Sequence, residues 1–510
     1  MMNGILRIQT YRPRQSAPVE GVTVVITGSG FTAHRITDAE GNAEDVAICA
    51  PACALSLDEN NTTTLPYAVC SLTARKPGYR TVRIQGIQIF AGQVTLARPE
   101  MIPDTEEGKD IANPPVIIPT HALFAGNGGS GPAPTEHCTG SRVLDRVIVP
   151  KNITVHLGRP AASARNVTVS FRDYIANVAS SEVYPTWPIE ALKANIHCQI
   201  SLALNRIYTE YYRSRGFDFD ITSLPAYDQT FVNGRDTFEN VGELAEQLWT
   251  TYIRRKGSIE PLYAQYCNGT TTTCSGLSQW GTVALAEQGL SPIEILRSYY
   301  GDNIELVENA PVIGFETSVP PYVLRLGAAS NDVAILQARL NRISSNYPNI
   351  PKIANVNGIY DLSTRDAVTE FQRTFSLTTD GITGRSTWYE VLRVYTAVKK
   401  LSELNSEQIT YDEIPIVFPL EIAPGSTGNE VRVIQYYLNF ISSYYDTVPS
   451  IEIDGIYGPL TEASVAAFQT TMGLPATGVI DEPTFDLMYE NYLAFVRSLP
   501  DESGAAAVPF

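Results

Sequence analysis

The stretch that decides the fold of the central part of this chain is "FRDYIANVASSEVYPTWPIEALKANIHCQISLALNRIYTEYYRSRG", residues 171–216. Its first twelve residues predict a helix, because Phe171, Ile175 and Val178 recur at steps of four and three and define one apolar face. Glu182 falls four residues beyond Val178 and therefore lies on the same face. An acid in that position is partly desolvated, which raises its pKa toward the range that a general acid needs near neutral pH. Its alternative role is structural, as a cap on a neighbouring loop.

The segment "YPTWP" ends this first helix, because Pro185 disfavours helical geometry at Tyr184. Thr186 is expected to cap a second helix that runs to Gly216. The core stripe of that helix is predicted to consist of Ile189, Leu192, Ile196, Ala203, Ile207 and Tyr211.

The end of the first helix carries two aromatic residues, Tyr184 and Trp187. They are expected to form an open aromatic corner through which a substrate reaches Glu182. His197 and Cys198 lie within the core stripe of the second helix, and they are interpreted as satisfied interior residues.

Length and charge limit the classes of protein to which the chain can belong. With 510 residues it predicts three or four domains. The formal charge of -17 disfavours binding to nucleic acid. The sequence contains no run of eighteen apolar residues, so no membrane span is predicted. The start "MMNGILRIQTYRPRQ" lacks the apolar core of a signal peptide.

The seven cysteines form no repeated Cys-x-x-Cys pairs, so a zinc cage is weakly supported. The polar loop "CNGTTTTC", Cys267 to Cys274, suits a local disulfide, with free thiols as the alternative.

The N-terminal region, residues 1–100, alternates between apolar and polar residues, with turn signals between the runs. This pattern predicts a small antiparallel, all-β sandwich. The segments "VEGVTVVITG", "ITDAEGN" and "KPGYRTV" resemble the carboxypeptidase regulatory-like domains of the transthyretin-like class. Residues 101–147 are instead rich in Pro, Gly and Ser, and they predict an exposed linker in which Arg142 and Arg146 precede Val147.

The C-terminal part of the chain contains an internal repeat with a spacing of about 97 residues. "NGIYDLSTRDAVTEFQRTF" from Asn357 aligns with "DGIYGPLTEASVAAFQTTM" from Asp454, and a helical pattern precedes each copy. Each copy predicts a three-helix domain and resembles the helical peptidoglycan-binding domain of many wall hydrolases. Tyr360 and Tyr457 are expected to offer flat faces to sugar rings, with core packing as the alternative.

The central region has a more specific resemblance. "DYIANVASSEVYPTWPIEALKANIHCQISLALNRIY" together with "YCNGTTTTCSGLSQWGTVALAEQGLSPIEILRSYYG" resembles the sporulation stage II protein D family, and within it the clostridial-type spore cortex-lytic enzymes. The resemblance assigns the catalytic acid to Glu182. It also places the "LSQWG" residues Ser278, Gln279 and Trp280 in the substrate cleft, with Tyr266 nearby. Tyr184 and Trp187, from the aromatic corner, are the other expected substrate-binding residues of this region. Some members bind zinc in the middle loop, but "LPAYDQTF" contains no His or Cys, so no metal or other cofactor is expected.

The resemblance implies lytic transglycosylation of peptidoglycan glycan strands in the spore cortex during germination. One carboxyl suffices for that reaction, whereas hydrolysis needs a second carboxyl about 5 to 9 Å away, for which Asp173 and Asp228 are candidates. The resemblance also implies a spore location and storage as a proform that a protease activates near Arg146 and Val147. The alternatives are a peptidoglycan hydrolase, either muramidase or amidase, and a non-catalytic wall-binding protein.

The predicted fold class is therefore multidomain, with an N-terminal all-β sandwich, a central α+β catalytic domain and two C-terminal three-helix domains. The predicted boundaries are 1–100, 101–147, 148–312, 320–398 and 418–493.

Overall fold

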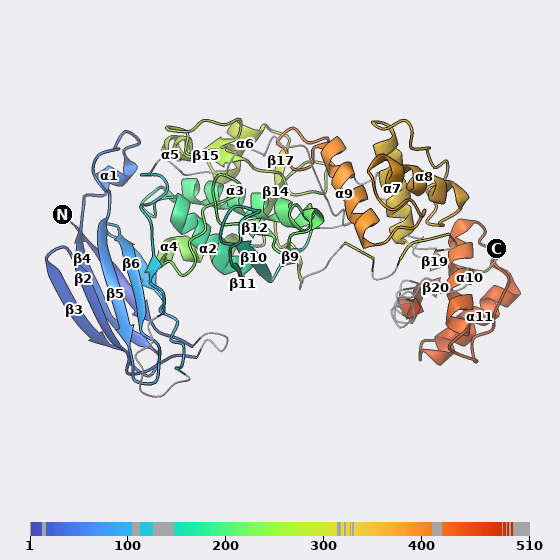
Figure 1. Ribbon diagram of the computed structural model, residues 1–510, viewed down its shortest axis with the longest axis horizontal. Helices are drawn as coiled ribbons and strands as arrows, with labels where there is room; N and C mark the ends of the chain where they lie inside the picture. The colour runs from blue at the N-terminus through green and yellow to red at the C-terminus, as the bar shows by residue number, and fades with distance from the viewer. Residues whose placement is uncertain are drawn as a thin grey trace. The chain divides into compact units, whose positions relative to one another are not determined.

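The computed structural model divides the chain into two compact units (Figure 1). Of the residues that the structure describes, those from 2 to 313 and 401–408 belong to the first unit, and those from 318 to 400 and from 409 to 492 belong to the second. The structure describes residues 2–12, 17–104, 113–125, 147–313, 318–320, 323–326, 328, 331–410, 421–481, 483–485, 487–488 and 491–492. Arg142 and Arg146, at the candidate activation site, lie outside the described residues.

The N-terminal part of the first unit is a sandwich of two sheets that enclose an aliphatic core. One sheet has the order β13-β7-β1-β4, formed by Thr237–Phe238, Val94–Ala97, Met2–Gln9 and Asn42–Ala50. The other has the order β3-β2-β5-β6-β8, formed by Phe31–Ile36, Thr23–Gly28, Ala68–Arg75, Val82–Ile89 and Val116–Ile117. The alternating burial along these strands follows from their period-two pattern.

The sandwich differs from the predicted one in three respects. It includes a short helix, α1 (Ala54–Leu57), and two strand pairs, β1 with β7 and β6 with β8, are parallel. Strands β8 and β13 come from beyond residue 100, and β13 belongs in sequence to the central region. Strand edges with unpaired backbone groups recruit such distant segments, and a local sequence pattern does not reveal them.

Strand β8 approaches β6 closely at Gly86, where the register of β6 shifts. Gly86 has a φ of 83°, and a Cβ atom there would lie 2.2 Å from the carbonyl oxygen of Ile118. Glycine is therefore required at this position, both for the left-handed backbone and for the passage of the segment that follows β8.

The central domain is built around one buried helix, α3 (Ile189–Tyr208), as predicted for an α+β fold. Helix α3 packs against four other helices: α2 (Phe171–Glu182), α4 (Glu239–Leu248), α5 (Gln279–Glu287) and α6 (Pro292–Tyr300). The short strands at its periphery are β9 (Val149–Pro150), β10 (Asn152–His156), β11 (Asn166–Ser170), β12 (Ile221–Thr222), β14 (Tyr252–Arg255), β15 (Tyr266–Cys267), β16 (Leu277–Ser278), β17 (Ile304–Val307) and β18 (Val312–Ile313). A helix surrounded on all sides is buried on nearly every face, and its side chains can reach a site in the domain interior.

The structure corrects three details of the predicted second helix. It ends at Tyr208, because Glu210 takes a left-handed conformation with a φ of 40°; only a short 3-10 turn, η1 (Arg213–Arg215), precedes Gly216. Thr186 does not cap it, because Pro188 occupies the cap position. Ile189 is 54% exposed and lies outside the core, whereas Leu192 of the same turn is buried.

The second unit contains the two sequence repeats. The first repeat has the three predicted helices, α7 (Asn331–Ser344), α8 (Leu362–Thr374) and α9 (Arg385–Lys399). The second has α10 (Asn429–Ser442), α11 (Pro459–Thr471) and the strand pair β19 (Glu421–Ile422) with β20 (Ile480–Asp481), followed by helical residues between 483 and 492.

Matching hydrogen bonds show that the repeats are structurally equivalent. Gln372 accepts the backbone N–H of Gly381 at 2.8 Å, and Gln469 accepts that of Gly478 at 2.9 Å. The Gln of the repeated "FQ" motif is therefore a structural residue, which holds the loop after the middle helix.

Candidate active site

Helix α2 fixes the position of the candidate acid. The Ser170 side chain caps the helix by accepting the backbone N–H of Asp173 at 3.0 Å, and the chain becomes extended at Val183. The observed helix coincides with the predicted one, and its apolar face packs toward α3. Glu182 is the last helical residue of that face and is 0% exposed, so the predicted burial of the acid is confirmed and is complete.

Three hydrogen-bond donors from distant parts of the chain surround the Glu182 carboxyl. Its Oε1 accepts the backbone N–H of Thr230 at 2.7 Å. Its Oε2 accepts the Tyr266 hydroxyl at 2.5 Å and the Gln199 side-chain amide at 3.2 Å. The sequence pointed to Tyr266 but not to Gln199 or Thr230. The only visible signal for Gln199 was a polar residue within an apolar stretch, and Thr230 carried no such signal.

The pKa of Glu182 is raised to about 7. Burial is the dominant cause, because it penalises the charged carboxylate, and the donors from Thr230, Tyr266 and Gln199 oppose it by stabilising that form. Both protonation states are thus accessible near neutral pH. Such a carboxyl can donate a proton in one step and accept one in the next.

The strand pair β15–β16 brings the "LSQWG" segment to the same place. Tyr266 pairs with Leu277, and the disulfide suggested by the sequence joins Cys267 to Cys274 across the intervening loop. The Gln279 side-chain amide donates to the backbone carbonyl of Glu182 at 3.4 Å. The Ser278 side chain caps α5 by accepting the backbone N–H of Gly281 at 3.0 Å.

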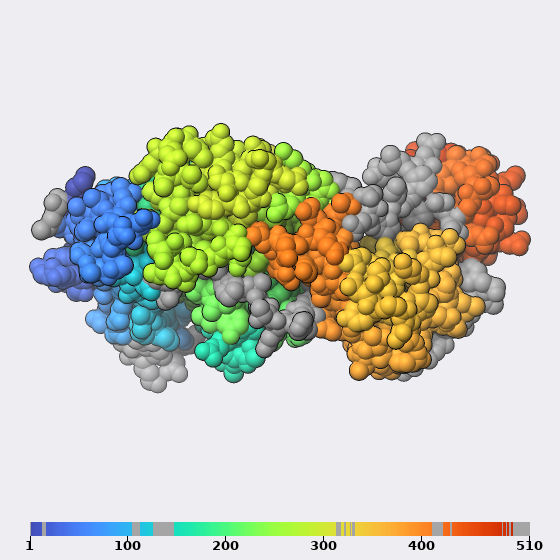
Figure 2. All heavy atoms as spheres, turned by 90° about the horizontal axis from the view of Figure 1, so that it is seen from above, coloured from blue at the N-terminus to red at the C-terminus, as the bar shows by residue number. Residues whose placement is uncertain are grey.

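The aromatic corner beside Glu182 is closed, whereas an open corner was predicted. Tyr184, Trp187 and Trp280 pack against one another and are 2%, 3% and 7% exposed. The sandwich domain supplies the cover, and Figure 2 shows that domain, in blue, directly against the central domain. The corner is closed because the three rings have a large apolar area, and removing that area from water stabilises the folded protein.

Specific contacts connect this cover to the corner. Ser56 of α1 accepts the Trp187 indole N–H at its carbonyl oxygen and the Thr186 hydroxyl at its Oγ, at 3.1 Å and 2.7 Å. The centroid of the Phe90 ring lies 5.3 Å from that of the Tyr184 ring, and the centroid of the His121 ring lies 4.7 Å from it.

The two candidate second carboxyls have other partners. Asp173 lies at the opposite end of α2, nine residues from Glu182 or about 13 Å along the axis. Asp228 is fully buried and forms an ion pair with Arg206 at 2.8 Å. It also accepts the hydroxyls of Tyr212 and Thr222, both at 2.6 Å.

The residues present do not fit a zinc ion in the middle loop. The stretch "LPAYDQTF", residues 224–231, offers one carboxylate, Asp228, which is already paired with Arg206. Among the described residues there is no group of three or more His, Cys, Asp or Glu side chains that could hold a metal.

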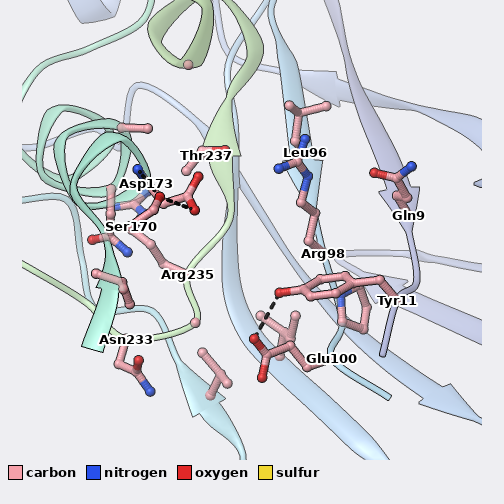
Figure 3. A pocket seen from close by; sticks show the side chains of 18 of the residues that line it. Gln9, Tyr11, Leu96, Arg98, Glu100, Ser170, Asp173, Asn233, Arg235 and Thr237 are labelled. Atoms are coloured by element: carbon pink, nitrogen blue, oxygen red, sulfur yellow. Dashed lines mark hydrogen bonds between the residues drawn. The ribbon is translucent and has the colours of Figure 1, made fainter. Parts of the chain in front are cut away.

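A groove of about 1620 Å³ lies between the sandwich and the central domain (Figure 3). Tyr11, Arg98 and Glu100 line its sandwich side, and Asp173 and Asn233 line the other. Neither Glu182 nor the aromatic corner belongs to its lining.

The predicted stacking faces in the repeats are absent. Tyr360 and Tyr457 are 0% and 1% exposed, and their hydroxyls donate to the carbonyl oxygens of Gly381 and Gly478 at 3.0 and 2.8 Å. A phenol whose ring fills a core and whose hydroxyl is satisfied there offers no face to a sugar. The alternative of core packing holds at both positions.

Within the part of the chain that the structure describes, no helix is both long and apolar enough to cross a membrane.

Comparisons with known proteins give one family match and two curated relatives. The family model described as "Putative peptidoglycan binding domain" matches residues 329–390 and 427–488. The N-acetylmuramoyl-L-alanine amidase CwlL of Bacillus licheniformis is 32% identical over 163 residues, which cover 32% of this chain and 44% of that protein. The zinc D-Ala-D-Ala carboxypeptidase of Streptomyces albus G is 36% identical over 69 residues, which cover 14% and 26%.

The chain therefore spans less than half the length of both curated relatives. Among solved structures, the SleB N-terminal domain is 25% identical with a TM-score of 0.13, covering 15% of this chain and 99% of that one. The chain thus carries the peptidoglycan-binding domain twice, at residues 329–390 and 427–488.

Proposed function

We propose that this protein is a peptidoglycan lytic transglycosylase, acting on spore cortex, that cleaves the bond between N-acetylmuramic acid and N-acetylglucosamine. The observation that carries the proposal is the Glu182 carboxyl, fully buried, held by three donors and with a pKa of about 7. The two peptidoglycan-binding repeats support the choice of substrate.

The proposed reaction needs one carboxyl in two protonation states. Glu182 donates its proton to the glycosidic oxygen, and the bond from that oxygen to C1 of the muramic residue breaks. The resulting carboxylate then takes the proton of the C6 hydroxyl, whose oxygen bonds to C1 and closes the 1,6-anhydro ring. No water is consumed, and Glu182 ends the cycle protonated as it began.

The partners of the other carboxyls favour this reaction over hydrolysis. A hydrolase needs a second carboxylate to act as base or nucleophile near the first. Asp228 is held by Arg206, and Asp173 lies at the far end of α2. Neither of these two candidates is therefore placed to act as the second carboxylate beside Glu182.

We also infer that this form of the protein is a proform. Glu182 is 0% exposed, and Ser56 and Phe90 of the sandwich cover the aromatic corner that leads to it. Val147 is itself buried, at 4% exposure. We therefore place the activating cut N-terminal to Val147, within the Gly- and Pro-rich residues 126–146.

Mass analysis of the products from purified spore cortex tests the reaction class. A transglycosylase leaves 1,6-anhydro-muramic ends. New reducing ends would instead indicate a muramidase, and new amino termini an amidase, the activity for which the Bacillus relative is named. Unchanged muropeptides after removal of residues 1–146 would indicate a wall-binding protein.

A further inference from the structure

A second layer of side chains lies behind the Glu182 carboxyl, centred on Gln229. Gln229 is fully buried and immediately precedes Thr230. Its Nε2 donates to the backbone carbonyl of Gln199 at 3.1 Å and to the Tyr266 hydroxyl oxygen at 3.0 Å. Its Oε1 accepts the Tyr174 hydroxyl at 2.9 Å. Both hydrogens of the Gln229 amide and its oxygen are thus engaged.

The backbone carbonyl of Gln199 fixes the direction of these bonds. A carbonyl only accepts, so the atom of Gln229 that faces it must be the donating nitrogen. The same nitrogen donates to the Tyr266 oxygen, so the single hydrogen of that hydroxyl must point elsewhere. It points to Oε2 of Glu182, 2.5 Å away.

We propose that Gln229 is a positioning residue that locks the Tyr266 hydroxyl as a donor to Glu182, through a one-way chain from Tyr174 to Gln229 to Tyr266 to Glu182. This chain of hydrogen bonds favours the carboxylate form of Glu182, since every donor in it points toward the acid. Burial favours the neutral acid, and the two effects oppose each other.

This inference rests on the proposed role of Glu182 as a proton donor. After Glu182 protonates the glycosidic oxygen, the new carboxylate meets a hydroxyl that is already oriented toward it. No side chain has to rotate at that moment, so the charge is stabilised without reorganisation.

Other ionisable groups near Glu182 and its network could contribute to its titration. Tyr174 and Tyr266 belong to the hydrogen-bond chain itself, and Asp228 lies beside Gln229. The others lie around the end of α2: Tyr184, His121, Arg235 and Asp236. Arg235 donates to Ser181, and Asp228 is paired with Arg206, so both charges are engaged with groups other than Glu182.

The test measures the pKa of Glu182 in the full chain without turnover. The melting temperature is recorded against pH for a protein with Glu182 and for its Glu182→Gln partner, and the difference between the curves reports the ionisation of Glu182. This pair is made in the native sequence and in Gln229→Met, Tyr174→Phe and Tyr212→Phe backgrounds. Tyr212→Phe is the matched control. It removes a buried phenol hydroxyl of the same domain, which donates to Asp228 and is not a member of the hydrogen-bond chain to Glu182.

We expect Gln229→Met to raise the pKa of Glu182 by about one unit, because the Tyr266 hydroxyl is then no longer held as a donor to the carboxylate. Tyr174→Phe should raise it by less, and Tyr212→Phe should leave it unchanged. An unchanged pKa in a folded Gln229→Met protein, or an equal shift in Tyr212→Phe, would overturn the proposal. If Gln229→Met does not fold, an unchanged pKa in Tyr174→Phe overturns it. A shifted pKa in a protein that yields no anhydro ends would refute the proposed function alone.

Discussion

At the scale of single residues, the proposed reaction depends on the protonation of Glu182. Its pKa of about 7 in the folded protein lies above its value of about 4.3 in an unfolded chain. Between these two pH values the folded state binds a proton that the unfolded state has lost. The stability that this proton contributes is fully present below pH 4, and it is lost as the pH rises through 7.

The first prediction follows from this loss of stability with rising pH. Relative to Glu182→Gln, the native protein should lose about 3 kcal/mol of unfolding free energy between pH 4 and pH 8, at about 1.4 kcal/mol for each unit of pKa shift. Urea unfolding across this pH range measures the loss in both proteins. Parallel curves would mean that Glu182 titrates in the folded protein as it does in the unfolded chain.

Local sequence predicted the burial of Glu182 but not the hydrogen-bond donors to its carboxyl; only the family resemblance pointed to Tyr266. Burial followed from local spacing, because Phe171 and Val178 lie on the same helical face. The donors could not be found in this way: Gln199, Thr230 and Tyr266 are 17, 48 and 84 residues distant in the chain. Only tertiary packing decides which polar groups meet a buried carboxyl.

At the scale of elements, the β15–β16 pair holds Tyr266 at the acid, and Gln279 follows β16 as the first residue of α5. The disulfide closes the loop between the two strands. Helix α2 was predicted with its observed bounds, since periodicity and a proline stop agree there, and the structure adds a Ser170 cap at its start. Helix α3 was predicted too long. Its apolar pattern continues into residues that pack as a turn, and no Gly or Pro marks the end at Tyr208.

Removal of this disulfide is the second prediction. The double variant Cys267→Ser/Cys274→Ser should lower the unfolding free energy by about 2.5 kcal/mol, the entropy expected for so short a loop. It should also weaken the Tyr266 donor to Glu182, because β15 loses its covalent tie. Denaturant unfolding measures the first effect, with Cys53→Ser as the control, since Cys53 forms no disulfide. An unchanged midpoint would show that the strand pair is held by its hydrogen bonds and packing alone.

At the scale of the whole molecule, the sandwich belongs to the same compact unit as the central domain. The sequence predicted both regions and the two repeats, but not that β13 (Thr237–Phe238) would extend a sandwich sheet. This strand follows the loop that holds Glu182 at Thr230, so the cover and the acid share one segment of chain.

The third prediction concerns this cover. A full chain with a specific protease site introduced within residues 126–146 should gain cortex-cleaving activity when it is cut, because the Ser56 and Phe90 contacts can then separate from Tyr184 and Trp187. The release of soluble muropeptides before and after the cut measures the gain. Activity that is equal in the uncut chain would show that the covered corner does not limit access to Glu182.

The central claim is that Glu182 is the proton donor of a transglycosylation. Its most direct measurement is the yield of 1,6-anhydro-muramic ends from purified cortex, compared between the cut native protein, Glu182→Gln and Glu190→Gln. Glu190 is the matched control, since it lies in the first turn of α3 and is paired with Lys193. We expect anhydro ends from the native protein and Glu190→Gln, and at least about a hundredfold fewer from Glu182→Gln. Undiminished anhydro ends from a folded Glu182→Gln protein would contradict the claim.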